Sequence, residues 1–99
     1  MIRIVQLTFK EENFQDFLDH FETVKEAINN FPGCKGMKLL VDKNQVGVVF
    51  TYSEWESVND LDNYRKSELF GSIWPKVKKW FANKPQAWSN DLYFDGFPN

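Results

Sequence analysis

The chain has 99 residues and a net charge of −2, with 42% apolar and 17% aromatic residues. This length suits a single domain over residues 1–99, and the interspersed charges exclude the basic surface that binds nucleic acid. No stretch approaches the roughly 20 apolar residues of a membrane span, and the first residues lack a signal-peptide pattern. With one cysteine, Cys34, no internal disulfide can form, so we expect a cytoplasmic protein.

The first half of the chain predicts a strand, a helix and a hairpin. Residues 2–9 are rich in β-branched and aromatic side chains, which favour a strand. From Glu11 onward, apolar residues recur at intervals of three and four, which predicts an amphipathic helix ended by Asn, Pro and Gly. Residues 36–42 and 45–53 then predict a β-hairpin that turns at residues 43–44.

The second half of the chain predicts two helical segments and a last strand. Ser53 and Ser57 each precede an acidic residue by three positions, as in a capping box, so the first segment can begin after either serine. A second segment begins at Ser67, and we expect it to kink or restart at Pro75, which has no N–H to donate. Residues 87–95 read as the final strand.

The resulting order of elements, β-α-β-β-α-β, predicts a fold class. It is typical of an α+β, ferredoxin-like domain with an antiparallel sheet and both helices on one face. The strands do not alternate cleanly, because runs such as 39–41 and 48–50 place apolar groups on both faces. We therefore expect a second copy of the chain to cover the open face, which gives a homodimer.

Three stretches resemble one family: FPGCKGMKLLVD at 31–42, VVFTYSEWES at 48–57 and YRKSELF at 64–70. In this order and spacing, the chain resembles the antibiotic-biosynthesis-monooxygenase superfamily over nearly its whole length. The resemblance implies a dimeric α/β barrel, in which two ferredoxin-like sheets lie face to face. Members include oxygenases, haem-degrading enzymes and proteins without a known activity, so the resemblance leaves the activity open.

The haem-degrading branch of that family uses a tryptophan, a histidine ten residues later and an asparagine on the first strand. Aligned on this chain, the tryptophan falls on Tyr64, the histidine on Trp74 and the asparagine near Val5 or Gln6. The iron ligand is therefore replaced by an indole, which cannot serve as an axial ligand. The resemblance implies no haem cofactor and no haem degradation here.

The cofactor-free, quinone-forming branch implies a different site. Its tryptophan at the end of the third strand matches Trp55, and Thr51 stands where that branch has an asparagine. A further contacting polar residue of the branch falls on Leu61. The chemistry implied is driven by the substrate: a deprotonated phenol passes an electron to O2, while the protein supplies an apolar pocket, orientation and a hydrogen-bond donor. No cofactor and no metal is needed.

These arguments single out six side chains for a pocket between sheet and helices. Several alternatives remain open: Trp55 as a packing wedge or a pocket wall, Tyr64 pointing into a cavity or away, and His20 as a rim residue or a general base at the pocket mouth. The two other aromatic residues fit a core as well as a wall. As catalytic candidates we name Thr51, Trp55 and Tyr64, and as substrate-binding candidates His20, Phe70 and Trp74.

Two functions from different classes fit this pattern. The first is a cofactor-independent monooxygenase, or related oxidoreductase, that acts on a small aromatic or lipophilic substrate. The second is a non-catalytic dimeric module that binds an apolar ligand. An enzyme needs a hydrogen-bond donor and a base that face one cavity, whereas a binding module needs only apolar walls. The enzyme and the binding module therefore differ in one observable feature, which is whether polar groups converge on one cavity.

Overall fold

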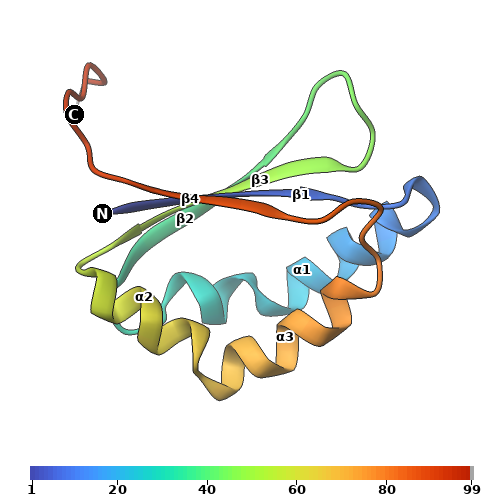
Figure 1. The fold of residues 1–99 in the computed structure, drawn as a ribbon, viewed down its shortest axis with the longest axis horizontal. Helices are drawn as coiled ribbons and strands as arrows, with labels where there is room; N and C mark the ends of the chain where they lie inside the picture. Colours follow the sequence, from blue (N-terminus) through green and yellow to red (C-terminus); the bar gives the residue numbers. More distant parts are fainter. Residues whose placement is uncertain (99) are drawn as a thin grey trace.

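The computed structural model describes residues 1–98 and contains four strands and three α-helices. Figure 1 shows the helices together on one side of the sheet, as the order of elements predicts. Within residues 1–98, no helix combines the length and apolarity needed to cross a membrane. In chain order the elements are β1 (Ile2–Thr8), the 3-10 turn η1 (Glu11–Asn13), α1 (Phe14–Asn29), β2 (Cys34–Val41), β3 (Val48–Trp55), α2 (Val58–Arg65), α3 (Glu68–Lys78) and β4 (Gln86–Asn90).

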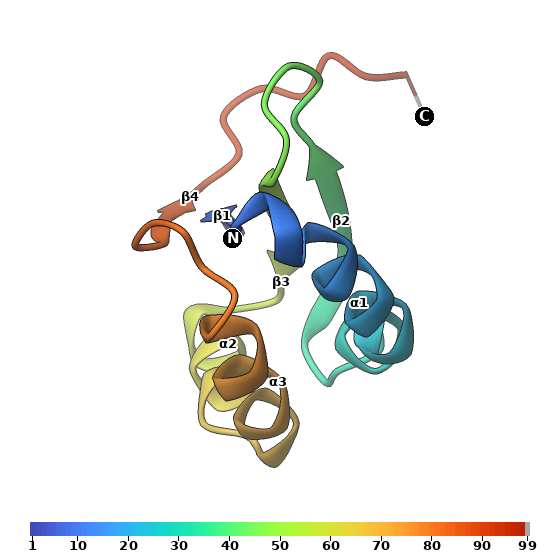
Figure 2. The same cartoon turned by 90° about the vertical axis from the view of Figure 1, so that its right-hand side faces the viewer.

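The sheet has the order β2-β3-β1-β4, and every neighbouring pair is antiparallel. This is the ferredoxin-like arrangement, so the predicted α+β fold class is confirmed. The two strands that are adjacent in sequence form the hairpin, while β1 lies between β3 and β4. Figure 2 shows α1 and the α2–α3 pair below the sheet, with the hairpin loop and the C-terminal segment on the opposite side.

The core lies between the helices and one face of the sheet, where the strands alternate in side-chain direction. Leu7 pairs with Val49 across β1 and β3, and both side chains are buried in a cluster that includes Phe9 and Phe17. The rings of Phe9 and Phe17 stack with their centres 4.2 Å apart. This end of the fold is tightly packed, and it holds β1 against α1.

The opposite face of the sheet has no helix over it. Ile4 pairs with both Tyr52 and Trp88, and Phe50 pairs with Leu40, so one apolar patch crosses all four strands. Leu40 is 49% exposed and Trp88 is 44% exposed. The prediction of apolar residues on both faces therefore holds, and this patch, called the open face below, is the part that the helices leave uncovered.

The last strand is shorter than predicted. It covers Gln86–Asn90 and not residues 87–95. Its final residue, Asn90, pairs with Ile2, where β1 begins, so Asp91 has no partner residue on β1. The prediction extended the strand to residue 95, but a strand needs a neighbour to accept its hydrogen bonds.

The hairpin turn is longer than the predicted two residues. It runs from residue 42 to residue 47, because the Asp42 carboxylate accepts hydrogen bonds from the backbone N–H groups of Asn44 (3.0 Å) and Gln45 (2.7 Å). Gly47 has a φ of +90° and its carbonyl accepts from the N–H of Phe9 at 2.8 Å. A side chain at this position would also meet the Phe9 carbonyl, so the turn requires glycine here.

Helix boundaries follow the capping groups. Ser57, and not Ser53, caps α2, because its hydroxyl accepts from the backbone N–H of Asp60 at 3.1 Å. Pro75 lies inside α3, which continues to Lys78, so the predicted restart is wrong. The missing N–H affects only the carbonyl of Gly71, an exposed residue that water can reach.

Candidate functional site

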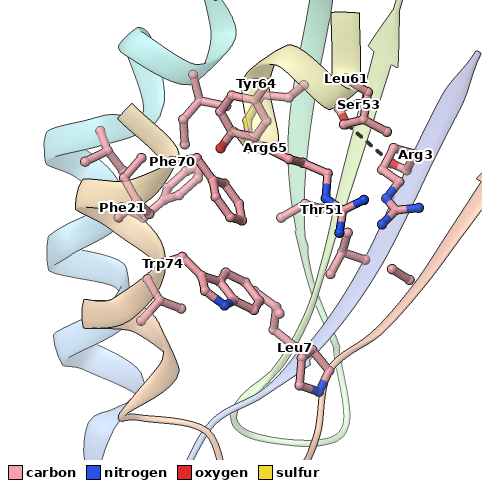
Figure 3. A pocket seen from close by; sticks show the side chains of 18 of the residues that line it. Arg3, Leu7, Phe21, Thr51, Ser53, Leu61, Tyr64, Arg65, Phe70 and Trp74 are labelled. Carbon is pink, nitrogen blue, oxygen red and sulfur yellow. Dashed lines mark hydrogen bonds between the residues drawn. The ribbon is translucent and has the colours of Figure 1, made fainter. Parts of the chain in front are cut away.

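A cavity of about 370 Å³ lies between the sheet and the helices. This volume is within the range of small-molecule binding sites. Strands β1 and β3 form its floor, and α1, α2 and α3 form its other walls, as the close-up in Figure 3 shows. All six candidate residues line it: Thr51, Trp55, Tyr64, Phe70, Trp74 and His20.

A continuous row of aromatic rings forms one wall of the cavity. The ring centres of Trp55 and Tyr64 are 5.3 Å apart, as are those of Tyr64 and Phe70. Phe70 then stacks on Trp74, with centres 5.5 Å apart and planes 15° from parallel. The row joins β3 to both later helices. Offset and edge-to-face contacts of this kind stabilise the wall and present polarisable surface to a ligand.

Trp55 combines the two roles that its position suggested. It is only 2% exposed, so it is a packing wedge at the end of β3, and it also lines the cavity. Its indole N–H donates to the hydroxyl of Ser53 at 2.9 Å. Ser53 in turn lies near the carbonyl of Arg3, at 3.4 Å. Because the indole N–H already has an acceptor, Trp55 offers a ligand its ring and not a hydrogen bond.

Tyr64 provides the polar group of the aromatic wall. Figure 3 shows its hydroxyl directed toward Phe70 and the cavity, and within residues 1–98 the hydroxyl makes no hydrogen bond. Burial, with a smaller contribution from nearby Cys34, raises the pKa of Tyr64 to about 12. The phenol therefore stays protonated at neutral pH, so it can donate a hydrogen bond but cannot act as a base.

His20 lies on α1 at the cavity wall and is half-buried. Its Nε2 atom is buried and has no hydrogen-bond partner within residues 1–98. The ring meets Trp80 edge-on, with centres 6.0 Å apart. Burial, and then the positive charges of Lys76 and Lys79, lower the pKa of His20. The imidazole is therefore neutral at pH 7, which is the form that accepts a proton.

Thr51 lies on the floor of the cavity, where β3 runs beside β1. It pairs with Val5 on β1 and Leu39 on β2, so its side chain shares the helix-facing side of the sheet. Within residues 1–98, its hydroxyl makes no hydrogen bond to another group, so it is free to bind a ligand. Leu61, 6% exposed, closes the same region from α2.

Comparison with known proteins gives the family. The model of the family described as "Antibiotic biosynthesis monooxygenase" matches residues 1–75, which is more than half of the chain. The chain belongs to this family. No curated protein matches it significantly in sequence. The match ends before β4 and includes every element of the cavity wall up to Trp74.

Solved structures show that the fold is shared at low sequence identity. Rv0793 from Mycobacterium tuberculosis superposes with a TM-score of 0.86 at 11% identity, covering 97% of each chain. An antibiotic biosynthesis monooxygenase gives a TM-score of 0.80 at 21% identity, covering 99% of this chain and all of its own. A conserved protein from Methanosarcina mazei Go1 also gives 0.80 at 21% identity, covering 87% and 86% of the two chains.

Sequence reasoning missed three polar residues of this monooxygenase-type fold: Arg3, Ser53 and Arg65. Ser53 was considered only as a helix cap, although it is a strand residue that accepts the indole N–H. Arg3 has the same two-residue phase as Val5 and Leu7, and that phase was the available signal that it faces the helices. For Arg65, no pattern in the sequence indicated the cavity.

Metal-binding groups do not gather in this part of the protein. Within residues 1–98, no three side chains of His, Cys, Asp or Glu lie close enough together to hold a metal ion. The cavity wall itself contains one such residue, His20.

Proposed function

We propose that this chain is a cofactor-independent monooxygenase that oxidises a small aromatic substrate in the cavity. Membership of the monooxygenase family and the aromatic wall support the class of reaction and the class of substrate. The observation that carries the proposal is the convergence of three unpaired polar groups on one apolar cavity: the hydroxyls of Thr51 and Tyr64 and the imidazole of His20. A passive apolar site would not need them.

The proposed reaction converts a phenol to a quinone with O2 alone. For 1-naphthol, one oxygen atom enters the ring at C4 as the second carbonyl, and the other oxygen leaves as water. The two hydrogens of that water come from the phenol hydroxyl and from C4. The substrate supplies all four electrons that reduce O2, so no external reductant takes part.

The two titratable residues of the cavity, His20 and Tyr64, have different roles because their protonation states differ. Neutral His20 accepts the phenol proton, which produces the electron-rich phenolate that reacts with O2. Protonated Tyr64 donates a hydrogen bond to the reduced oxygen that forms beside the ring. Thr51 positions the substrate oxygen, and the aromatic row holds the ring in a site from which water is excluded.

An oxygen electrode tests this proposal directly. With 1-naphthol and no added cofactor or metal, we expect one O2 consumed for each naphthoquinone formed. His20→Gln should lower the rate at least about tenfold, since general-base catalysis contributes 10²-fold or more. Lys43→Gln is the control, because Lys43 is exposed in the hairpin turn and does not line the cavity. Turnover that is equal in wild type and His20→Gln would contradict the role of His20.

The second candidate function is a binding module without chemistry, and one observation favours it. The indole N–H of Trp55 is already bound to Ser53, so this wall residue offers a ligand only its apolar ring. In this case 1-naphthol would quench the tryptophan fluorescence saturably, Trp55→Phe would weaken the response, and no O2 would be consumed. Binding together with O2 consumption supports the enzyme.

We also propose that the chain acts as a homodimer joined through the open face. In the single chain, no helix covers this patch, and its apolar residues come from all four strands. They are Ile4, Leu40, Phe50, Tyr52 and Trp88. Apolar patches of this kind mark association surfaces. A second copy suits this mainly apolar patch, in which Gln6 and Lys38 are polar, because a two-fold interface brings the same surface of both chains together.

The C-terminal segment adds to the same surface. Beyond β4 it carries four exposed large apolar residues, and Figure 1 shows it on the side of the sheet that has no helices. A second copy seated on the open face would lie beside this segment and would bury its side chains. An obligate dimer of this type buries about 2,000 Å² or more in total. The four residues are Leu92, Tyr93, Phe94 and Phe97.

A further inference from the structure

The charged residues of the cavity all have the same sign. The sequence contains ten lysines and two arginines, and both arginines, Arg3 and Arg65, line the cavity while no lysine does. No aspartate or glutamate lines it either, although the chain as a whole carries a net charge of −2. The cavity therefore has two permanent positive charges and no negative charge of its own.

Arg3 occupies an unusual place for a charged residue. It lies on the central strand β1, on the side that faces the helices, and pairs with Ser53 on one side and Ser89 on the other. Its guanidinium donates to the hydroxyl of Ser89 at 2.9 Å. Within residues 1–98, the one ion pair joins Lys25 to Glu22, so Arg3 has no carboxylate within 4.0 Å. Most of its five N–H donors are unused.

Arg65 approaches Arg3 from the helices. It is the last residue of α2, and Figure 3 shows its side chain crossing to the same end of the cavity, beside Thr51. Burial, and then the positive charge of Arg65, lower the pKa of Arg3. The carboxylate of Asp62 offsets part of this effect, but it lies more than 4.0 Å from Arg3 and does not line the cavity. Two like charges on the wall of one cavity repel each other, and burial strengthens this repulsion. Arg65 is exposed, so water alone can stabilise its charge. Arg3 is half-buried, so water alone does not account for a charge at this position.

We propose that the cavity binds an aromatic carboxylate, with its ring against Tyr64, Phe70 and Trp74 and its anionic group between Arg3 and Arg65. The inference rests on the proposed function for the aromatic body and adds the anionic group as a determinant of specificity. Guanidinium groups bind planar carboxylates through two parallel hydrogen bonds, and such charge-assisted bonds are stronger than neutral ones. The hydroxyl of Thr51, at the same end, provides a further donor.

Geometry separates this arrangement from a general attraction of anions to the surface. The two charges and the aromatic row lie on the walls of one cavity, so a ligand can contact both only if it has an apolar body and an anionic end. The ten lysines do not line the cavity, so they cannot favour a ligand that has both an apolar body and an anionic end.

Binding of matched probes under anaerobic conditions tests the inference without turnover. We expect 1-naphthoate to bind about tenfold or more tightly than its neutral isostere 1-naphthamide, because hydrogen bonds to charged groups contribute more than neutral ones. Arg65→Gln and Arg3→Gln should each remove most of this preference while the dissociation constant of 1-naphthamide stays within about twofold. Lys66→Gln is the matched control, since Lys66 is next to Arg65 but does not line the cavity.

Each result has a defined meaning. Equal affinity for naphthoate and naphthamide overturns the inference and leaves the proposed function standing, whereas binding of neither probe overturns both. Equal effects of Lys66→Gln and Arg65→Gln also overturn it, because the attraction would then be a property of the surface. A third probe, 1-naphthyl phosphate, identifies the anion: weaker binding than naphthoate supports a planar carboxylate, and tighter binding replaces it with phosphate. Arg65 is exposed, so its variant tests the inference even if Arg3→Gln does not fold.

Discussion

The two faces of the sheet are built from the same strands and differ in what covers them. On the helix-facing side, Leu7 and Val49 are buried by α1 and α3, and a cavity remains beside them. On the open face, Phe50 and Tyr52 come from the neighbouring positions of β3, yet nothing in the single chain covers them. One face is thus covered by the chain's own helices, while no helix covers the other.

The comparison also explains why polar groups occur on the covered side. The helices span the sheet but do not fill the space above Thr51, so that end of the helix-facing side has room for Tyr64 and two arginines. On the open face, the polar residues Gln6 and Lys38 lie among apolar ones, but within residues 1–98 no helix faces them and they enclose no cavity. A covered face that is not filled suits a ligand, and an uncovered face that is apolar suits a second copy.

The largest effect should come from a charge on the open face. Phe50→Glu would bury an unpaired carboxylate in the proposed dimer, and a two-fold interface contains the substitution twice. Each buried charge costs several kcal/mol, so we expect the dissociation constant to rise by about a thousandfold or more. Sedimentation velocity over a range of concentrations measures it.

The control for that experiment is Val58→Glu. Val58 is exposed at the start of α2, on the helix side of the sheet, so the same new charge should leave the dimer intact. Wild-type protein that sediments as a monomer at micromolar concentration would refute the homodimer.

A pair of tryptophan variants separates the two faces. Trp55→Ala should lower the free energy of unfolding by about 3–5 kcal/mol, as large-to-small changes of buried aromatics do. Trp88→Ala, on the open face, should leave the unfolding of the separated protomer almost unchanged and weaken the dimer. Urea unfolding at low and at high protein concentration distinguishes these effects, because only dimer-dependent stability changes with concentration.

A smaller effect is expected from Ser53→Ala, which tests the hydrogen bond beneath the cavity. Removing the hydroxyl leaves the buried indole N–H of Trp55 without an acceptor, which costs about 1–3 kcal/mol of unfolding free energy. Ser57→Ala removes a helix cap of α2 and serves as a comparison at about 1 kcal/mol. A Ser53→Ala protein as stable as wild type would mean that the indole N–H finds another partner.

The smallest effect is a dependence of stability on pH that His20 causes. Burial lowers the pKa of His20 below its unfolded value of about 6.5. The unfolded chain therefore takes up the proton first as the pH falls, so stability decreases from pH 6.5 downward until the folded pKa is passed. His20→Gln should flatten this part of the stability curve, measured by urea unfolding at a series of pH values. An unchanged slope in the variant would assign it to other groups.

Much of the fold followed from local pattern. The β-branched and aromatic residues in 2–9 and the period of three and four after Glu11 predicted β1 and α1 to within a few residues. The boundaries that went wrong depended on distant partners. The end of β4 is set by where β1 begins, and the length of the hairpin turn is set by Asp42 and by the approach of Gly47 to Phe9.

The candidate site was predicted in its aromatic part and not in its charged part. Trp55 was identified because it stands at the end of a strand and matches a family pattern. Tyr64 and Trp74 were identified because they fall on two site positions of the haem-degrading branch. Arg65 had no such signal, since an arginine near the end of a helix is more often solvated. Only the packing of α2 against the sheet brings it to the same end of the cavity as Arg3.

The amino-acid sequence by itself determined the order of the elements, the apolar character of both sheet faces and the aromatic residues available for a wall. These properties follow from periodicity and composition, which act over a few neighbouring residues. The tertiary structure alone decided that the indole N–H of Trp55 is bound to Ser53, that Nε2 of His20 is buried without a partner, and that two arginines share one cavity. Such contacts join residues that are far apart in the chain or depend on which way a strand faces, and only the packed fold sets both.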